Sequence, residues 1–196
     1  MIFNKATKQA FICPTKVGTF TVTHFLTNIG WKSLGGPHHF FGKIAEKYPN
    51  LLQYQVYCFM RDPLARFESA ILHIKQMPYT RDDFQRFIDE QGINKAAEQV
   101  SYDEVVDMIP ALPIKFEMLF KPQTAWFTHS NIQALDFHNM EAELRRVTGN
   151  TEQPLVRYNT STDFGRSVIT DKVRAFVREH YAADYALAKD RLGKEY

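Results

Sequence analysis

Two short segments of nearly uninterrupted apolar sequence constrain the fold more than any other feature of this chain. The first is Gln9–Cys13 and the second is Val56–Met60. Strands that are apolar at every position, and not at alternate ones, are typical of a parallel sheet covered on both faces. Helical periodicity follows each segment, with apolar stripes at Val22, Phe25, Leu26 and Ile29 and at Leu64, Phe67, Ile71 and Ile74. The sequence therefore predicts a strand, a loop and a helix, twice in succession.

The remaining periodic stretches extend this alternation. Ala134–Phe137 predicts a third buried strand, and helices are predicted over Asp82–Ile93, over Met140–Val147 and, as one long helix, from Thr170 to Leu192. Helices alternating with short apolar strands predict an α/β fold, specifically a three-layer, P-loop-like domain with a central, mainly parallel sheet flanked by helices. With 196 residues, the chain is expected to form a single domain over 1–196.

Charge and cysteine content limit the classes of partner and compartment. There are 24 Lys and Arg against 22 Asp and Glu, a net charge of +2, which does not indicate a nucleic-acid-binding surface. The longest stretch without a charged residue, Val17–Trp31, is too short for a membrane span. No signal peptide is evident, and Cys13 and Cys58 lack metal-ligand spacing. We expect free thiols in a cytoplasmic protein without a membrane span.

The loop after the first strand has the chemistry of an anion-binding site. It joins a strand to a helix N-terminus, where backbone N–H groups and the helix dipole favour negative charge. Lys16 adds a positive charge, Gly18 permits close approach of the backbone, and Thr19 and Thr21 carry hydroxyl donors. The order of lysine and glycine differs from that of a Walker A loop. A strand-to-helix turn with a solvated lysine is the alternative interpretation.

The loop after the second strand suggests a second anion-binding site. Arg61 lies at the expected end of the strand, and Asp62 is a good N-cap for the helix that follows. At about 100° per residue, Arg66 and Ser69 fall opposite the apolar stripe, so Ser69 can reach an anion held by Arg61. The alternative is a capped helix whose arginine and serine face water. Two neighbouring anion sites suggest a nucleotide with two separated phosphate groups.

Together the two loops resemble the nucleotide-binding motifs of sulfotransferases, in particular the carbohydrate, membrane-associated type. The segment Arg61–Ser69 matches the R-D-P-x-x-R-x-x-S motif at every fixed position, and Pro14–Thr19 matches the P-K-x-G-[ST] loop more loosely. Weaker similarities occur at Lys121–Gln123, Asn159–Ser161 and Tyr181–Tyr185. The resemblance implies a donor, 3′-phosphoadenylyl sulfate (PAPS), a product, 3′,5′-adenosine bisphosphate (PAP), and no metal.

The resemblance also implies roles for individual residues. The first loop would hold the 5′-phosphosulfate, through Thr15, Lys16, Val17, Gly18, Thr19, Phe20 and Thr21. Arg61 and Ser69 would hold the 3′-phosphate. Lys16 would stabilise the charge that develops on the bridging oxygen between phosphate and sulfuryl group.

A general base must take the proton of the attacking hydroxyl. Histidine suits this role at neutral pH, and we expect His39 to serve, with His38 as the next candidate. A carboxylate serves in other branches of the family, so Glu46 and Glu68 stay open as alternatives.

The acceptor is expected to be a hydroxyl-bearing molecule, and the family resemblance favours a carbohydrate. Pro78–Arg81 and Lys121–Phe127 offer aromatic and basic side chains that could line a cleft for it, or they are ordinary surface loops. The oligomeric state stays open.

One departure from the family pattern keeps alternatives open. The family often has a second hydroxyl residue directly after G-[ST], and this chain has Phe20 there. A non-catalytic module that binds a nucleotide or a partner is therefore one alternative. A P-loop-type nucleotide kinase is another, although the Walker lysine is missing.

Overall fold

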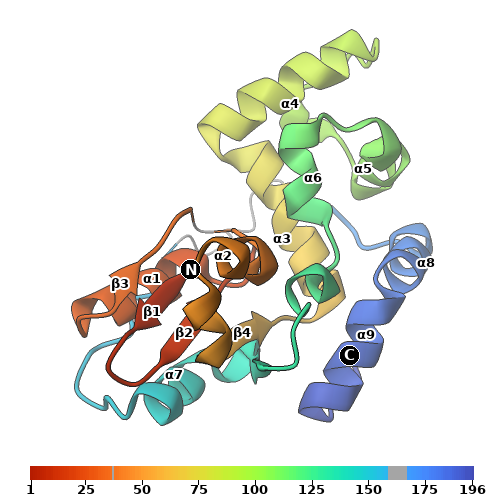
Figure 1. Cartoon of the computed structure of the whole chain (residues 1–196). Helices are drawn as coiled ribbons and strands as arrows, with labels where there is room; N and C mark the ends of the chain where they lie inside the picture. Colours follow the sequence, from red (N-terminus) through yellow and green to blue (C-terminus); the bar gives the residue numbers. More distant parts are fainter. Residues whose placement is uncertain (37, 159–166) are drawn as a thin grey trace. The chain divides into compact units, whose positions relative to one another are not determined.

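A computed structural model describes residues 1–36, 38–158 and 167–196 of the chain (Figure 1). By contacts between residues, the chain divides into two compact units. Unit 1 takes in the described residues of Met1–Arg61, Pro122–Thr160 and Ala183–Tyr196, and unit 2 those of Asp62–Lys121 and Ser161–Ala182. The expectation of one domain over 1–196 stays a prediction. The similarity at Asn159–Ser161 lies outside the described residues.

Unit 1 is built on a five-stranded sheet in the order β3-β1-β2-β4-β5. Its strands are β1 Ile2–Asn4, β2 Gln9–Ile12, β3 Lys32–Ser33, β4 Gln55–Met60 and β5 Ile132–Asp136. The central strand β4 is parallel to both β2 and β5, whereas β1 is antiparallel to β2 and to β3. The α/β class and the three buried parallel strands are confirmed. The expected mainly parallel sheet was wrong, because two antiparallel strands make it mixed.

The missed strand β1 owes its position to a turn at the beginning of the chain. The Asn4 side-chain oxygen accepts hydrogen bonds from the backbone N–H groups of Ala6 and Thr7, at 2.9 and 3.3 Å. Lys8 adopts a left-handed backbone conformation with φ 52°, which turns the chain back towards β2. Three residues are too few for a periodic signal, so the pattern of this polar segment did not reveal a strand.

Helices cover both faces of the unit 1 sheet. They are α1 Thr19–Asn28, α2 Phe41–Lys47, α7 Met140–Thr148 and α9 Ala182–Leu192, with short 3₁₀ segments at Pro49–Gln53, Gln123–Trp126 and Phe137–Asn139. Apolar residues of α1 and α7 pack with those of β2, β4 and β5 in one core cluster. On the opposite face, Ala188 of α9 packs against Met60 and Ala134. Alternate residues of β4 and β5 therefore serve two different cores.

All the secondary structure among the described residues of unit 2 is helical. Its helices are α3 Pro63–Gln76, α4 Pro78–Glu90, α5 Tyr102–Met108, α6 Ile114–Phe120 and α8 Asp171–His180, with 3₁₀ segments at Ala97–Gln99 and Ile109–Ala111. The predicted start of α3 is confirmed, because the Asp62 carboxylate accepts hydrogen bonds from the N–H groups of Leu64 and Ala65.

The long helix expected from Thr170 to Leu192 was wrong, because the chain forms α8 and α9 with a break at Tyr181. The Tyr181 ring is buried, and its hydroxyl donates a hydrogen bond to the Phe120 carbonyl oxygen at 2.7 Å. The helix predicted over Asp82–Ile93 begins four residues earlier, at Pro78, which suits a first helical position.

Candidate anion-binding site

The loops that follow β2 and β4 meet at one edge of the unit 1 sheet. The two strands are parallel, with Ile12 opposite Cys58, so their carboxyl ends point the same way. The guanidinium of Arg61 reaches the first loop, and its Nη1 donates a hydrogen bond to the Lys16 carbonyl oxygen at 3.1 Å. Two basic residues that are 45 positions apart in the sequence are thereby brought together.

The first loop is wound so that its backbone can face an anion. Lys16 and Gly18 both adopt left-handed conformations, with φ 65° and 73°. Such residues turn successive N–H groups towards a common concavity that binds anions. Gly18 is the N-cap of α1 and brings no side chain to cap the helix, so the first-turn N–H groups face this concavity. A side chain at Gly18 would also approach the terminal carbon of Met140 to 2.6 Å.

The hydroxyl groups of the loop are used by the chain itself. Thr19 Oγ1 donates to the Pro14 carbonyl oxygen at 3.2 Å, and Thr21 Oγ1 accepts from the Tyr158 backbone N–H at 3.0 Å. Val17 packs its side chain into the core, and Thr15 is also buried. Phe20, in contrast, is 64% exposed. The Thr19 hydroxyl proton is therefore already donated within the chain, whereas the Thr21 hydroxyl accepts and keeps a proton that it can donate.

Arg61 is fixed by a side chain that pairs with both its backbone groups. Gln123 Oε1 accepts from the Arg61 N–H at 3.0 Å, and Gln123 Nε2 donates to the Arg61 carbonyl oxygen at 2.8 Å. The guanidinium carbon lies 4.8 Å from the centre of the Phe137 ring, a cation–π distance. The hydrogen bonds of Gln123 to the Arg61 backbone and the Phe137 ring beside the guanidinium thus fix the position of this side chain.

Gln123 is itself held by a buried carboxylate. The two oxygens of Asp184 accept hydrogen bonds from the backbone N–H groups of Gln123 and Thr124, both at 2.8 Å, and cap this short helix. The sequence indicated Lys121–Gln123 and Tyr181–Tyr185 as family similarities, and Lys121–Phe127 as a possible lining of an acceptor cleft, but it did not indicate the contact between Gln123 and Asp184.

The ammonium group of Lys16 sits in an environment that disfavours its charge. Burial, and to a lesser extent repulsion from Arg61, together lower the Lys16 pKa to about 8. Among the described residues, no carboxylate forms an ion pair with Lys16. A bound anion would stabilise the ammonium form, because it supplies the negative charge that this part of the chain does not.

His38 and His39 differ in their surroundings. His38 Nδ1 lies 3.1 Å from the Cys13 carbonyl oxygen, which can only accept, so Nδ1 carries the proton and Nε2 keeps its lone pair. Burial lowers the His38 pKa, and Lys16 contributes to the lowering. His39 is exposed, and its ring lies against Gly35 and Gly36. His38 is therefore the histidine that the fold holds beside the anion loop in its neutral, basic form.

The other predicted site residues belong to α3 in unit 2. The expectation that Arg66 and Ser69 lie on a face away from the core was wrong, because both are buried, Ser69 with 6% of its surface exposed. Arg66 Nη2 donates to the carbonyl oxygens of Leu119 and Lys121, at 3.3 and 2.7 Å, and so caps the end of α6. The second arginine of the motif is therefore a structural residue.

The two carboxylate alternatives for the base lie on helices. Glu46 is exposed on α2. Glu68 belongs to α3, where it accepts a hydrogen bond from the Tyr102 hydroxyl at 3.4 Å.

The segments proposed to line an acceptor cleft are not open loops. Pro78–Arg81 forms the first turn of α4, and Trp126, the central aromatic residue of the other segment, is fully buried.

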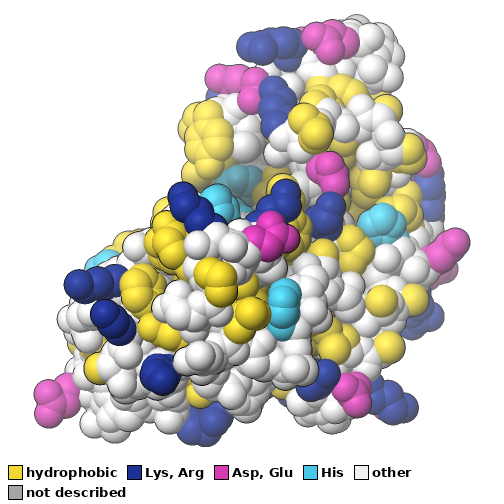
Figure 2. Space-filling view, in the orientation of Figure 1, with side chains coloured by type: hydrophobic (Ala, Val, Ile, Leu, Met, Phe, Trp, Pro, Cys, Tyr) yellow, Lys and Arg dark blue, Asp and Glu magenta, His cyan; other side chains and the backbone are white. Residues whose placement is uncertain are grey.

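The described residues contain no cluster of three or more His, Cys, Asp or Glu side chains suited to a metal ion. Within the same residues, no helix has the length and apolar character that crossing a bilayer requires. Figure 2 shows basic and acidic side chains interspersed over the visible face. Lys16 and Arg61 form a local pair of basic residues at the edge of the unit 1 sheet.

Comparison of the chain with protein-family models, with curated proteins and with solved structures gives no match in any of the three.

Proposed function

We propose that this protein is a PAPS-dependent sulfotransferase with a P-loop-like core, in which the loop after β2 holds the 5′-phosphosulfate. The observation that carries the proposal is the convergence of Lys16 and Arg61, joined by the 3.1 Å hydrogen bond at the end of two parallel strands. The concave backbone at Lys16 and Gly18 supports it, because such loops bind tetrahedral anions. Arg61 would contact the 3′-phosphate, as the resemblance implies.

The transfer step follows from the groups present. The acceptor hydroxyl oxygen forms a bond to sulfur as the bond between sulfur and the bridging oxygen breaks in line. The hydroxyl proton passes to His38 Nε2, and the electron pair of the broken bond stays on the 5′-phosphate of PAP. Lys16 stabilises the negative charge that develops on that oxygen and so lowers the free energy of the transition state.

Binding of PAP is the direct test, measured by isothermal titration calorimetry. We expect micromolar affinity in the unaltered protein and a loss of roughly 10- to 100-fold in Lys16→Ala and in Arg61→Ala, since each removes a charge-assisted contact. Lys8→Ala is a matched control, because Lys8 also has a positive φ and lies in the same unit. Binding that survives both substitutions, or that falls equally in Lys8→Ala, would place the nucleotide elsewhere.

A non-catalytic nucleotide-binding module is the second candidate, and Phe20 favours it. Its exposed ring stands in the first turn of α1, where the family often has a hydroxyl. A screen for transfer of radiolabelled sulfuryl from PAPS to glycans, small alcohols, phenols and tyrosyl peptides separates the two. The absence of transfer to every acceptor in the panel, together with PAP binding that depends on Lys16, would establish a non-catalytic nucleotide-binding module and exclude a sulfotransferase.

A further inference from the structure

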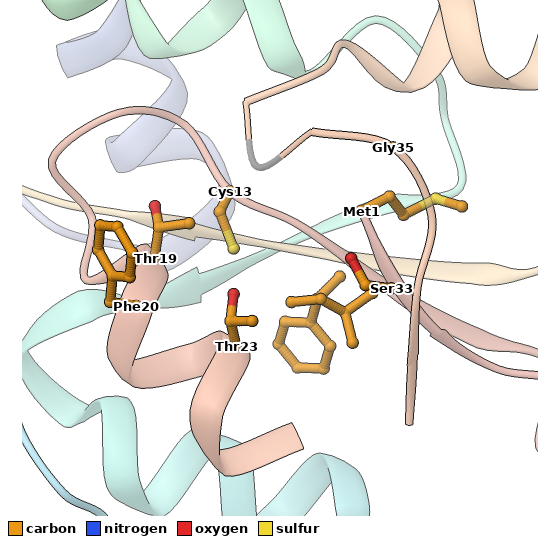
Figure 3. A pocket seen from close by; sticks show the side chains of 9 residues that line it. Met1, Cys13, Thr19, Phe20, Thr23, Ser33 and Gly35 are labelled. Atoms are coloured by element: carbon orange, nitrogen blue, oxygen red, sulfur yellow. The ribbon is translucent and has the colours of Figure 1, made fainter. Parts of the chain in front are cut away.

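A small pocket adjoins the anion loop on the side of α1, β2 and β3 (Figure 3). Its volume is about 160 Å³, and nine residues line it: Met1, Ile2, Phe11, Cys13, Thr19, Phe20, Thr23, Ser33 and Gly35. In Figure 3 the side chains of Thr19, Phe20 and Thr23 come from α1, and Ser33 and Met1 stand on the opposite side of Cys13. All nine residues belong to unit 1.

The lining favours an apolar occupant. Ile2 and Phe11 are buried core residues, Phe20 adds an exposed ring, and no side chain in the lining is charged. Burial raises the pKa of the Cys13 thiol to about 12, so this group is also neutral. The Met1 α-ammonium group, whose pKa is lowered by burial, donates hydrogen bonds to the carbonyl oxygens of Leu34 and Gly36, both at 3.3 Å. A sugar ring has a hydroxyl on nearly every carbon, and each needs a hydrogen-bond partner when buried. Only Thr19, Thr23 and Ser33 offer side-chain hydroxyls here, and Thr19 already donates to Pro14.

The volume sets the size of the occupant. An engineered protein cavity of about 150 Å³ with aliphatic and aromatic lining binds benzene. A pocket of about 160 Å³ is therefore large enough for one six-membered aromatic ring and too small to enclose an oligosaccharide or a fused polycyclic body.

The pocket shares residues with the proposed catalytic groups. Cys13 lines it, and the carbonyl oxygen of the same residue accepts the hydrogen bond from His38. Thr19 and Phe20 line it and also form the first turn of α1, whose N–H groups face the anion site. The position where the family has a second hydroxyl is thus occupied by a ring that forms a wall of the pocket.

We propose that this pocket is the acceptor site and that it takes a small phenol or aryl alcohol with a single ring. The inference rests on the proposed sulfuryl transfer and narrows its acceptor from the carbohydrate that the family resemblance favours. The phenolic oxygen forms the new bond to sulfur, its proton goes to His38 Nε2, and PAP leaves with the electron pair of the broken bond between sulfur and oxygen.

The test uses 4-fluorophenol as the probe, observed by fluorine NMR with saturating PAP. Thr23→Met fills the pocket from α1, and Thr27→Met is the matched control, because Thr27 is exposed one turn further along the same helix and does not line the pocket. Ser33→Leu fills the pocket from the opposite side, in case Thr23→Met does not fold. PAP affinity is measured on every variant.

We expect 4-fluorophenol to bind the unaltered protein and Thr27→Met, and to lose at least about tenfold in affinity in Thr23→Met and Ser33→Leu while PAP affinity stays within about twofold. PAP binding without phenol binding, or phenol binding that survives both filled variants, overturns the acceptor site but leaves the proposed function standing. Binding of a fluorinated monosaccharide in place of the phenol also overturns it. Phenol binding in a protein that does not bind PAP overturns the proposed function, and the acceptor role with it.

Discussion

The ammonium group of Lys16 is half-buried beside Arg61, and its lowered pKa makes nucleotide binding depend on pH. If PAP binds at this loop as proposed, it binds the protonated form, so above the pKa of about 8 the free protein must take up a proton to bind. Affinity is therefore expected to fall as pH rises above 8, by up to about tenfold per pH unit. Calorimetry between pH 7 and 10 measures this slope.

Lys16→Arg is the control for that slope. The guanidinium stays charged over the whole range, so the variant is expected to bind PAP with an affinity that does not change with pH up to 10. An equal slope in Lys16→Arg and in the unaltered protein would show that another group controls binding.

Gly18 combines a positive φ with close neighbours, whereas Gly149 has a similar φ of 68° and nothing near its would-be side chain. Gly149→Ala is expected to lower the free energy of unfolding by roughly 1–2 kcal/mol, the cost of the backbone conformation alone. Gly18→Ala is expected to cost about 1 kcal/mol more, since the ends of Met140 and Phe137 must shift. Urea denaturation measures both costs, and only Gly18→Ala should weaken PAP binding.

At the scale of elements, the short helix Gln123–Trp126 positions the end of β4. Gln123→Leu keeps the volume but removes both hydrogen bonds to the Arg61 backbone. We expect PAP affinity to fall roughly 3- to 10-fold, because Arg61 loses its fixed position and not its charge. Gln133→Leu, at an exposed position on β5, is the control and should leave affinity unchanged. Equal PAP affinity in the two variants would show that Gln123 does not position Arg61.

The contact between α3 and the end of α6 is expected to be one of the stronger polar interactions of unit 2. Arg66→Met leaves two half-buried carbonyl oxygens without their charged donor and is expected to cost roughly 1–3 kcal/mol of stability. Arg86→Met on α4 removes only an exposed ion pair with Asp83 and should cost less than about 0.5 kcal/mol. Thermal unfolding compares the two, and similar melting temperatures would contradict the structural role of Arg66.

The predictability of these elements followed the strength of their local signals. Asp62 before Pro63 and the apolar stripe of α3 act over a few residues, so that helix could be predicted. The burial of Ser69 could not, because a helical projection marks one apolar face and does not show that neighbouring helices cover the other. The break at Tyr181 was also hidden, since the apolar spacing continues from α8 into α9.

Only the part of the candidate site that follows from sheet topology could be predicted from the sequence. Lys16 and Arg61 follow parallel strands, and such strands place their ends at one edge of a sheet. Gln123 forms a hydrogen bond with Arg61, 62 positions away in the sequence, and Asp184 forms one with Gln123, 61 positions away. No local sequence pattern encodes contacts between residues so far apart. The choice between His38 and His39 depended on one carbonyl oxygen, that of Cys13, which only the folded chain brings into place.

At the scale of the whole molecule, each unit is assembled from segments that are separated in the sequence. A fragment of residues 1–121 lacks β5, which pairs with β4 from Val56 to Met60. We expect this fragment to give no near-ultraviolet circular dichroism signal by itself, and to regain it when residues 122–196 are added. A folded spectrum from 1–121 alone would contradict the dependence of the sheet on β5.

The burial of Cys13 and Cys58 has a consequence for how the protein withstands oxidants. Burial raises the pKa of both thiols far above neutrality, so the thiolate that reacts with peroxide is almost absent. Although one of these sulfur atoms borders the pocket, sulfenylation there is expected to be slow. The chemistry at this sheet edge should thus be insensitive to the redox poise of the surrounding compartment.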